Sequence, residues 1–582
     1  MFDDFYVQSV LMPSKSLKAN ERSYINLENA YCDIISGSII FGLNGYASFD
    51  TYYNSISLSV WNDLCDIGAL QLSLRGTGSF FIQQVFKNES NDEIILESCH
   101  MQLSPDIDSK LPIIKFSELP KKGLLFFKVW ATKDECKLMS GKWSSLLAPR
   151  QDVKLGIVIT HFNRKQYVLP SLQRISEQLL TDQFYKDRID FAVIDNSQNI
   201  TQEESCGITI IPNENLGGSG GFTRGLKYFH ERGDITHVLF MDDDASCEID
   251  SIKRAYSILR FSKEEDTAIS GALLREDITY SLIEQGATFD RVCRPSHHGK
   301  DVRLTSTLLD IEYSDAVNGY GAWWFFAFPL SLVTSYPFPF FVRGDDVLFG
   351  MMNSFNIISP MGICCYGEDF STKVSALTRY LDFRSGYVNM LYHNESALKI
   401  IRSYINLSLS VLFSAQYSSY DVIRMAVKHV GQCGTFWREN YDLSKVRGRI
   451  AELSEDEKLA KLDLKLFTYD INSDQESSKR RFMRTITLNG MLLPSNKKTV
   501  LQVKGSRASF REVFRYKNII YFDFINKKGV ISKVSKIKFF YGIIKLFLDC
   551  IIILLRHSKL ARCYKKDVNE ISTKEFWNEV YK

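Results

Sequence analysis

LGIVIT, at residues Leu155–Thr160, is a short apolar run of the kind that forms a buried β-strand. Three more such runs follow: IDFAVID (Ile189–Asp195), GITII (Gly207–Ile211) and HVLFM (His237–Met241). Helical periodicity fills the intervals, at Tyr167–Leu180, at about Phe222–Glu231 and at Ile249–Arg260. Strands that alternate with helices predict an α/β fold with a parallel, doubly wound sheet.

Sheets of this kind bind ligands beyond the carboxyl ends of their strands. Polar or glycine-rich segments occur at the corresponding positions: Thr160–Arg164, Asp195–Asn196, Asn213–Gly221 and Asp242–Asp244. We therefore expect one site in which these four segments meet.

The chain on either side of this α/β core has a different pattern. From about Met1 to Ser145, short apolar or alternating stretches predict a β-sandwich. The aromatic segment Tyr46–Trp61 fits sheet packing better than a saccharide-binding platform, because aromatic side chains usually fill cores. After about His393 the chain is helical and increasingly basic. The predicted domains are a β-sandwich at 1–150, an α/β catalytic domain at 151–400 and a helical region at 401–582.

The composition limits the class of protein. The chain has 582 residues, 13% of them aromatic, and a net charge of +3, so we expect several globular domains and no nucleic-acid partner. Twelve scattered cysteines without a CxxC pair favour neither a zinc module nor a disulfide framework. Met1–Val7 lacks the pattern of a signal peptide, and no run of eighteen uncharged apolar residues occurs. The sequence therefore predicts a cytoplasmic protein without a membrane-spanning helix.

LFMDDDA, at Leu239–Ala245, places three carboxylates directly after a predicted strand. Like charges held together repel one another, and partial burial strengthens the repulsion. Mg²⁺ or Mn²⁺ between carboxylates and a substrate diphosphate would relieve it. Alternate side chains of an extended backbone share a face, so Asp242 and Asp244 are the expected ligands, while Asp243 points elsewhere. A solvated acidic turn or a helix cap is an equally good interpretation of this run alone.

NENLGGSGGFTRG, at Asn213–Gly225, has four glycines in five positions ahead of a predicted helix. Such a segment lets the backbone approach a ligand closely, and helix N-termini favour anions. It is neither GxGxxG nor a P-loop, because no GK[ST] follows. A flexible turn is the alternative interpretation, and we favour a substrate loop.

FVRGDDVLFG, at Phe341–Gly350, carries Asp345 and Asp346 at the start of a predicted helix. Acidic residues are favourable and frequent at that position. A carboxylate in an apolar site would, however, also have a raised pKa and could act as a general base. Upstream, NGYGAWWFFAFP (Asn318–Pro329) contains Trp323 and Trp324, which either fill the core or stack against sugar rings.

These pieces occur in an order that resembles a known family. NLGGSGGF-x-R, LFMDDD, DAVNG-x-x-x-WW and FFVRGDD-x-x-FG together resemble the polymerising galactofuranosyltransferases. SFDTYYN…VW (Ser48–Trp61) and MSGKWS (Met139–Ser144) are similar to that family's N-terminal β-domain. The resemblance covers roughly Gly45–His393. It implies an N-terminal β-sandwich, a GT-A (Rossmann-like) catalytic domain of the glycosyltransferase family 2 type, and a helical C-terminal region.

The resemblance also assigns roles to individual residues. Asp346 matches the catalytic base, and Asp242 and Asp244 match the ligands of Mn²⁺ or Mg²⁺. The donor-binding assignments are Arg164, Asp195, Asn196, Asn215, Gly217, Gly218 and Asp243. The acceptor-binding assignments are Trp323, Trp324 and Asp345. Two positions depart from the family: Gly344 replaces an aromatic residue, and Gly367 stands where the family has a metal-ligating histidine, so Glu368, Asp369 or a water would complete the coordination.

Together these assignments predict a metal-dependent, inverting transferase that moves galactofuranose from UDP-galactofuranose to a growing, lipid-linked bacterial polysaccharide. One alternative is a transferase of the same fold that uses another donor, such as dTDP-rhamnose. The other is a non-catalytic carbohydrate-binding protein with a decayed site, suggested by Gly344 and Gly367.

The segment Ile537–Leu555 bears on location. It is apolar but broken by Lys545 and Asp549, and basic residues flank it, so it predicts a helix that lies on the inner face of the cell membrane. An ordinary packed helix is the alternative. The expected partners are a UDP-sugar donor, the polysaccharide acceptor and the cytoplasmic membrane surface, and the sequence leaves a homo-oligomer open.

Overall fold

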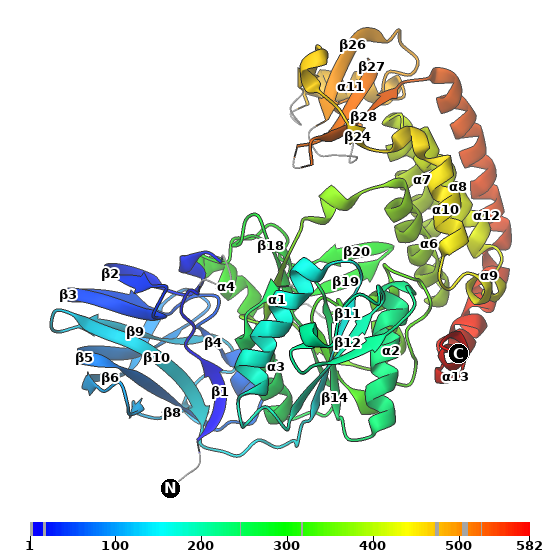
Figure 1. The fold of residues 1–582 in the computed structure, drawn as a ribbon. Helices are drawn as coiled ribbons and strands as arrows, with labels where there is room; N and C mark the ends of the chain where they lie inside the picture. The colour runs from blue at the N-terminus through cyan, green and yellow to red at the C-terminus, as the bar shows by residue number, and fades with distance from the viewer. Residues whose placement is uncertain are drawn as a thin grey trace.

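The computed structural model describes residues 4–14, 19–244, 246–315, 318–471, 476–502, 510–524 and 526–582. Its elements form three parts: an all-β part, a central α/β part and a helical arm that carries a small sheet (Figure 1). The arm leads away from the central part, and the last helix returns to lie near it (Figure 1).

The central sheet has seven strands in the order β13-β12-β11-β14-β21-β16-β22. The bounds are β11 Leu155–His161, β12 Ile189–Asp195, β13 Thr209–Pro212, β14 His237–Asp242, β16 Thr267–Ser270, β21 Phe326–Pro329 and β22 Asn356–Ile358. The first four strands of this order are parallel, as predicted. β21 lies outside the four predicted strands, and it runs antiparallel to both β14 and β16. β21 enters after a long excursion rather than a β–helix–β crossover, so nothing imposes a parallel direction on it.

Three helices follow the parallel strands: α1 (Lys165–Ile175), α2 (Gly217–Arg232) and α3 (Ile249–Phe261). The glycine run forms the first turns of α2 and is not a loop ahead of the helix, which corrects the sequence prediction. A Cβ on Gly221 would lie 2.3 Å from Cγ2 of Thr160 in β11. The absence of side chains therefore lets the start of α2 lie directly against the sheet.

The N-terminal part is all-β, as predicted. Its longer strands are β1 (Phe5–Ser9), β2 (Asn26–Asp33), β3 (Ser38–Ser48), β5 (Ala69–Lys87), β6 (Glu93–Leu103), β9 (Leu124–Ala131) and β10 (Cys136–Ser145). The two layers of the expected sandwich belong to one hydrogen-bonded sheet of ten strands. β5 pairs with β10 along its first half and with β9 along its second, and β3 pairs with both partners, so these four strands close on themselves.

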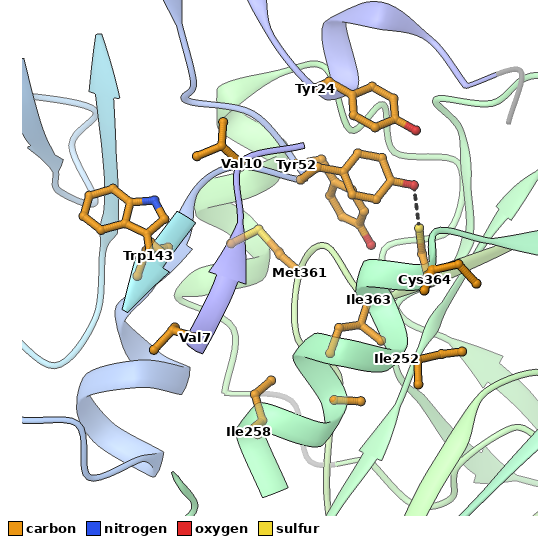
Figure 2. Packing of buried hydrophobic residues seen from close by; sticks show 14 of the residues in the cluster. Val7, Val10, Tyr24, Tyr52, Trp143, Ile252, Ile258, Met361, Ile363 and Cys364 are labelled. Carbon is orange, nitrogen blue, oxygen red and sulfur yellow. Dashed lines mark hydrogen bonds between the residues drawn. The ribbon is translucent and has the colours of Figure 1, made fainter. Parts of the chain in front are cut away.

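One apolar core joins the all-β part to the central part. Val7 and Trp143 of the N-terminal sheet belong to the same buried cluster as Ile252 of α3 (Figure 2). Tyr52, Tyr53 and Trp61 are buried in that cluster too, which confirms the packing interpretation for this stretch of Tyr46–Trp61. Tyr46 differs, because its half-buried ring lies beside Trp130, with 4.9 Å between the ring centroids.

The C-terminal arm is built around α12 (Lys536–Ile571), which packs against α6 (Ala376–Tyr392), α7 (Ala397–Phe413) and α8 (Tyr417–Val430). The helical prediction is confirmed for these elements. Between Ala460 and Lys533, however, five short strands form a sheet in the order β24-β28-β27-β26-β25, which the sequence did not lead us to expect. In the described parts of the chain, no helix is both long enough and apolar enough to cross a membrane.

Candidate active site

The three carboxylates at the end of β14, from Asp242 to Asp244, have different partners. The Asp243 carboxylate accepts hydrogen bonds from the backbone N–H of Phe162 (3.1 Å) and lies 3.0 Å from His161 Nδ1. Its other oxygen lies 3.4 Å from Arg164 Nη1, and Arg164 also forms an ion pair with Asp244. Asp243 therefore holds the segment after β11 in place. These contacts engage both of its carboxylate oxygens, so its earlier assignment to donor binding is not favoured.

Burial, and then the charges of Asp244 and Asp243, raises the pKa of Asp242 to about 8. When the three carboxylates are ionised, their negative charge exceeds the positive charge nearby. Arg164 and Lys373 compensate only part of it. A group of carboxylates with excess negative charge suits Mg²⁺ or Mn²⁺. Such an ion is commonly bound by one or two carboxylates together with substrate phosphates. In the described residues no third His, Cys, Asp or Glu converges to within 4.8 Å of this pair. Asp242 and Asp244 fit a divalent cation that a bound diphosphate would help to ligate.

The segment that departs from the family pattern lies beside Asp244. β23 (Cys364–Gly367) pairs with β15 (Ser246–Cys247), which directly follows the acidic turn. Lys373 Nζ lies 3.6 Å from Asp244 Oδ2 and 3.3 Å from Glu368 Oε2, so it bridges the two carboxylates. Asp369 is directed elsewhere, because its carboxylate lies 3.4 Å from Arg275 Nη1. Of the two acidic side chains considered for the missing histidine, Glu368 is the one that shares Lys373 with Asp244.

Asp195 and Asn196, two of the residues assigned to the donor, form hydrogen bonds with nearby backbone groups. The buried Asp195 carboxylate accepts hydrogen bonds from the N–H groups of Ser197 (2.9 Å), Asn199 (2.7 Å) and Ile200 (2.8 Å). The Asn196 side chain donates to the carbonyl of Gly217 (3.2 Å). These bonds give Asp195 a structural role, and its assignment as a donor contact stays a proposal. They fix the loop after β12 against the start of α2.

The start of α2 reaches the acid pair of the FVRGDD segment. Gly217 has φ +69°, and a Cβ there would lie 2.1 Å from the carbonyl oxygen of Phe341, so only glycine fits. The Asn215 side chain accepts a hydrogen bond from the Gly217 N–H (3.2 Å). Ser219 then donates its N–H to the Phe341 carbonyl (3.0 Å) and its hydroxyl to the Asp345 carboxylate (2.7 Å). The glycine segment and the acid pair are therefore one structural unit, although well over a hundred residues separate them.

Asp345 and Asp346 begin α5 (Asp345–Met352) and lie in different environments. Burial raises the pKa of Asp345 to about 6, although the Ser219 hydroxyl lowers it. Burial, and then the charge of Asp345, raises the pKa of Asp346 to about 7. Asp346 Oδ1 accepts a hydrogen bond from the Val347 N–H (2.8 Å), and backbone hydrogen bonds lower its pKa somewhat. The Ser219 hydroxyl thus positions Asp345, whereas Asp346, without a side-chain donor of this kind among the described contacts, is the better candidate to accept a proton.

The local structure explains why this chain has glycine at position 344, where the family has an aromatic residue. Its φ is +82°, and a Cβ would lie 2.7 Å from Cβ of Ser385 in α6. An aromatic side chain at this position would require both the backbone and α6 to move. The glycine is therefore matched to the packing of α6 in this chain, and Gly344 by itself is no sign of a decayed site.

The two tryptophans have different surroundings. Trp323 is only 5% exposed, and its ring packs edge-on against Phe222, Phe240 and Phe349. It therefore fills the core and cannot offer a ring face to a sugar, which corrects its assignment to the acceptor site. Trp324 is half-buried, donates its N–H to the carbonyl of Gly271 (2.8 Å), and keeps its acceptor assignment as a proposal.

The sequence analysis missed several residues of this site. Glu284, at the end of β18 (Leu282–Glu284), is buried, and burial followed by the charge of Asp346 raises its pKa. Ser219 and Lys373 contact acidic side chains directly, as described above. A lone glutamate that ends an apolar run was an available signal. Nothing in the local sequence marks Ser219 or Lys373, because their partners lie far away along the chain.

Comparison with known proteins shows what this site belongs to. Residues 156–287 match the model of the family described as Glycosyl transferase family 2. The chain is 22% identical to the galactofuranosyltransferase GlfT2 of Mycobacterium tuberculosis, over 70% of this chain and 68% of that protein. The chain is a glycosyltransferase. This glycosyltransferase is also 21% identical to GlfT2 of Mycolicibacterium smegmatis, over 67% of its own length and 65% of the relative's. The resemblance inferred from the motifs is confirmed.

Two solved structures align with part of this glycosyltransferase. A mannosyltransferase from Pyrobaculum calidifontis, in complex with GDP-Man and Mn²⁺, aligns with a TM-score of 0.28 and 14% identity, covering 49% of this chain and 78% of that one. TarS 1–349 of S. aureus aligns with a TM-score of 0.30 and 12% identity, covering 53% and 95%.

Proposed function

We propose that this glycosyltransferase moves galactofuranose from UDP-galactofuranose to a growing, lipid-linked bacterial polysaccharide, with inversion at the anomeric carbon. The observation that carries the proposal is the joining of the Asp345–Asp346 pair to the start of α2 through Ser219. A carboxylate with a raised pKa thus lies near the glycine segment at the start of α2, which we assign to the donor. The resemblance to galactofuranosyltransferases supports the choice of donor.

In this proposal Asp346 removes the proton of an acceptor hydroxyl as its oxygen attacks the anomeric carbon on the side opposite UDP. One displacement inverts the configuration, so a single base suffices and no covalent sugar–enzyme intermediate forms. Asp345 accepts a hydrogen bond from the Ser219 hydroxyl and so fixes the start of α5 to the start of α2. A divalent cation at Asp242 and Asp244 would supply positive charge opposite the leaving diphosphate.

A panel of nucleotide sugars tests the donor. We expect release of UDP from UDP-galactofuranose, with transfer to an oligogalactofuranose acceptor, at a rate well above that seen with dTDP-rhamnose or UDP-galactopyranose. Preference for dTDP-rhamnose would replace the proposed donor while leaving the reaction class intact. The absence of turnover with every donor, in the presence of Mn²⁺ or Mg²⁺, would contradict an active enzyme.

The pKa of Asp346 predicts how the rate depends on pH. The base must be ionised to accept a proton, and burial raises its pKa to about 7. We therefore expect kcat/KM to rise with pH through a midpoint near that value, and to fall about tenfold per pH unit below it. An initial-rate profile with saturating metal measures this dependence. A flat profile down to about pH 5, near the ordinary range of a carboxyl group, would contradict it.

We also propose that α12 lies on the membrane surface. Its two interrupting charges face the protein: Asp549 is buried and forms hydrogen-bonded pairs with Arg424 (2.6 Å) and Tyr404 (2.7 Å), and Lys545 lies 3.1 Å from Asp421 of α8. The opposite face of the same helix exposes apolar side chains, which are Ile537, Tyr541, Ile544, Phe547, Leu548, Ile551, Ile552 and Leu555. Basic residues continue the exposed face beyond it: Lys559, Arg562, Lys565 and Lys566. An apolar stripe with basic residues at its end suits a bilayer interface with anionic headgroups.

Point substitutions test this proposal better than truncation, because the buried face of α12 holds the helical arm together. Replacing Ile544, Phe547 and Leu555 together by serine should lower sedimentation with anionic liposomes by about tenfold or more, since each loses apolar burial in the interface. Leu398→Ser is the matched control, because Leu398 is 71% exposed but lies on α7. High salt should weaken binding of the unaltered chain. Equal sedimentation of the triple variant and the unaltered chain would contradict the proposal.

A further inference from the structure

Cys433, Cys563 and Asp567 come together on the helical arm, away from the transfer site. One ligand atom of each lies within 4.8 Å of the other two, and in the described residues this is the one such grouping of three His, Cys, Asp or Glu side chains. Cys563 and Asp567 are four residues apart on α12, so they share a face of one helical turn, and Cys563 Sγ lies 3.0 Å from Asp567 Oδ2. Cys433 comes from the turn that precedes α9 (Gly434–Glu439).

The backbone around Cys433 is specialised for this approach. Cys433 has φ +56° and ψ −147°, a conformation close to a region that glycine occupies almost alone. The next residue is Gly434, where a Cβ would lie 2.9 Å from Cγ of Asp567. The Gly434 N–H donates to Asp567 Oδ2 (2.7 Å). Cys433 is strained, and Gly434 leaves room for the Asp567 carboxylate. The surrounding structure therefore holds these three side chains close together.

The elements that carry the three side chains are held rigidly. The buried Tyr564, next to Cys563, donates its hydroxyl to the carbonyl of Val430 (2.9 Å) and accepts a hydrogen bond from Trp437 Nε1 (3.0 Å). α12 and the turn before α9 are thus fixed to each other on the buried side of the cluster. Preorganised ligands on rigid elements favour metal binding, because little ordering remains to be done when the ion enters.

We propose that Cys433, Cys563 and Asp567 bind one Zn²⁺ ion, with a water as the fourth ligand. Two sulfur ligands select a soft or borderline ion such as Zn²⁺ over Mg²⁺ or Ca²⁺, and a tetrahedral site of this kind has Zn–S distances of about 2.3 Å. Binding displaces the protons of both thiols, so two protons leave for each ion bound. The hydrogen bond from Gly434 leaves the second carboxylate oxygen of Asp567 available to the metal. The sequence prediction of no zinc module relied on the absence of a CxxC pair, whereas these two cysteines are far apart along the chain.

The site has a structural consequence. α12 ends at Ile571, shortly after Asp567, and leads into α13 (Lys574–Val580). Beyond α13, the Tyr581 hydroxyl donates to the carbonyl of Gly220 in the first turns of α2 (2.6 Å). A metal at Asp567 would therefore fix α12 just before the chain crosses back to the helix that carries the glycine segment.

The test uses the full chain, purified under reducing conditions without chelators, and then loaded with Zn²⁺ or Co²⁺ alone. We expect about one tightly held Zn²⁺ per chain, and with Co²⁺ a thiolate charge-transfer band together with visible d–d bands of tetrahedral cobalt. Cys563→Ser should abolish these bands and lower Zn²⁺ affinity at least about tenfold, as the loss of a ligand or its orienting partner typically does. Asp567→Asn keeps a carbonyl oxygen for the Gly434 N–H, so it should fold while still weakening Zn²⁺ binding.

Cys550→Ser is the matched control, because Cys550 is a free cysteine on the same helix outside the cluster, and it should leave binding unchanged. Zn²⁺ binding that is identical in the unaltered chain, Cys563→Ser and Asp567→Asn would overturn the proposal. So would a Cys433–Cys563 disulfide in the freshly isolated protein with no zinc bound. None of these readouts depends on sugar transfer, so the outcome is independent of the proposed donor.

Discussion

Replacing Asp346 by Asn should lower turnover by roughly 10² to 10⁴-fold, the usual effect of losing a general base. The substitution is nearly isosteric, but an amide cannot accept the proton of the acceptor hydroxyl. Affinity for the donor should change little, because the diphosphate is expected at the acidic turn after β14. Initial rates at saturating donor, together with donor binding measured by calorimetry, give the two quantities separately.

The matched variant is Asp345→Asn. Its carbonyl oxygen can still accept the hydrogen bond from the Ser219 hydroxyl, so the junction between α2 and α5 should persist. We expect a smaller loss of turnover than in Asp346→Asn. The melting temperature of Asp346→Asn should be unchanged or higher, because burial disfavours the charge that is removed. If Asp345→Asn were the inactive variant and Asp346→Asn retained activity, the base would be assigned to the wrong carboxylate.

Replacing Asp244 by Asn should remove most metal-dependent turnover, with a loss of about 100-fold or more, because charge stabilisation at a leaving group is commonly worth that much. The donor should also bind more weakly, since the diphosphate would lose its counter-ion. Activity is measured across a titration of Mn²⁺, and the apparent metal affinity should fall along with the rate.

Chelation provides the control for this prediction. EDTA should silence the unaltered enzyme, and added Mn²⁺ or Mg²⁺ should restore it. Full activity of either the unaltered chain or Asp244→Asn in EDTA would contradict the metal assignment. Such a result would instead favour Arg164 and Lys373 as the positive charges at the leaving group, because both already lie beside Asp244.

The sequence determined those features that depend on neighbours along the chain. The runs at β11, β12 and β14 were predicted to within a residue or two, because an apolar run bounded by polar residues defines a buried strand by itself. Asp242 and Asp244 could be singled out for the same reason, since an acidic turn after a strand is a local pattern. The order of the motifs then pointed to a glycosyltransferase before any contact between them was known.

Tertiary structure alone decided how distant segments share their polar atoms. Asp195 was assigned to the donor by resemblance, yet its carboxylate also accepts hydrogen bonds from three backbone N–H groups. The sequence left Trp323 either in the core or against a sugar, and three phenylalanines surround it. Likewise, Asp549 interrupts an apolar run in the sequence but faces Arg424 in the folded arm. A side chain has a limited number of donor and acceptor sites, and which groups fill them depends on packing between elements far apart in the chain. Local sequence can therefore propose the members of a site, but packing determines which of them remain free to meet a substrate.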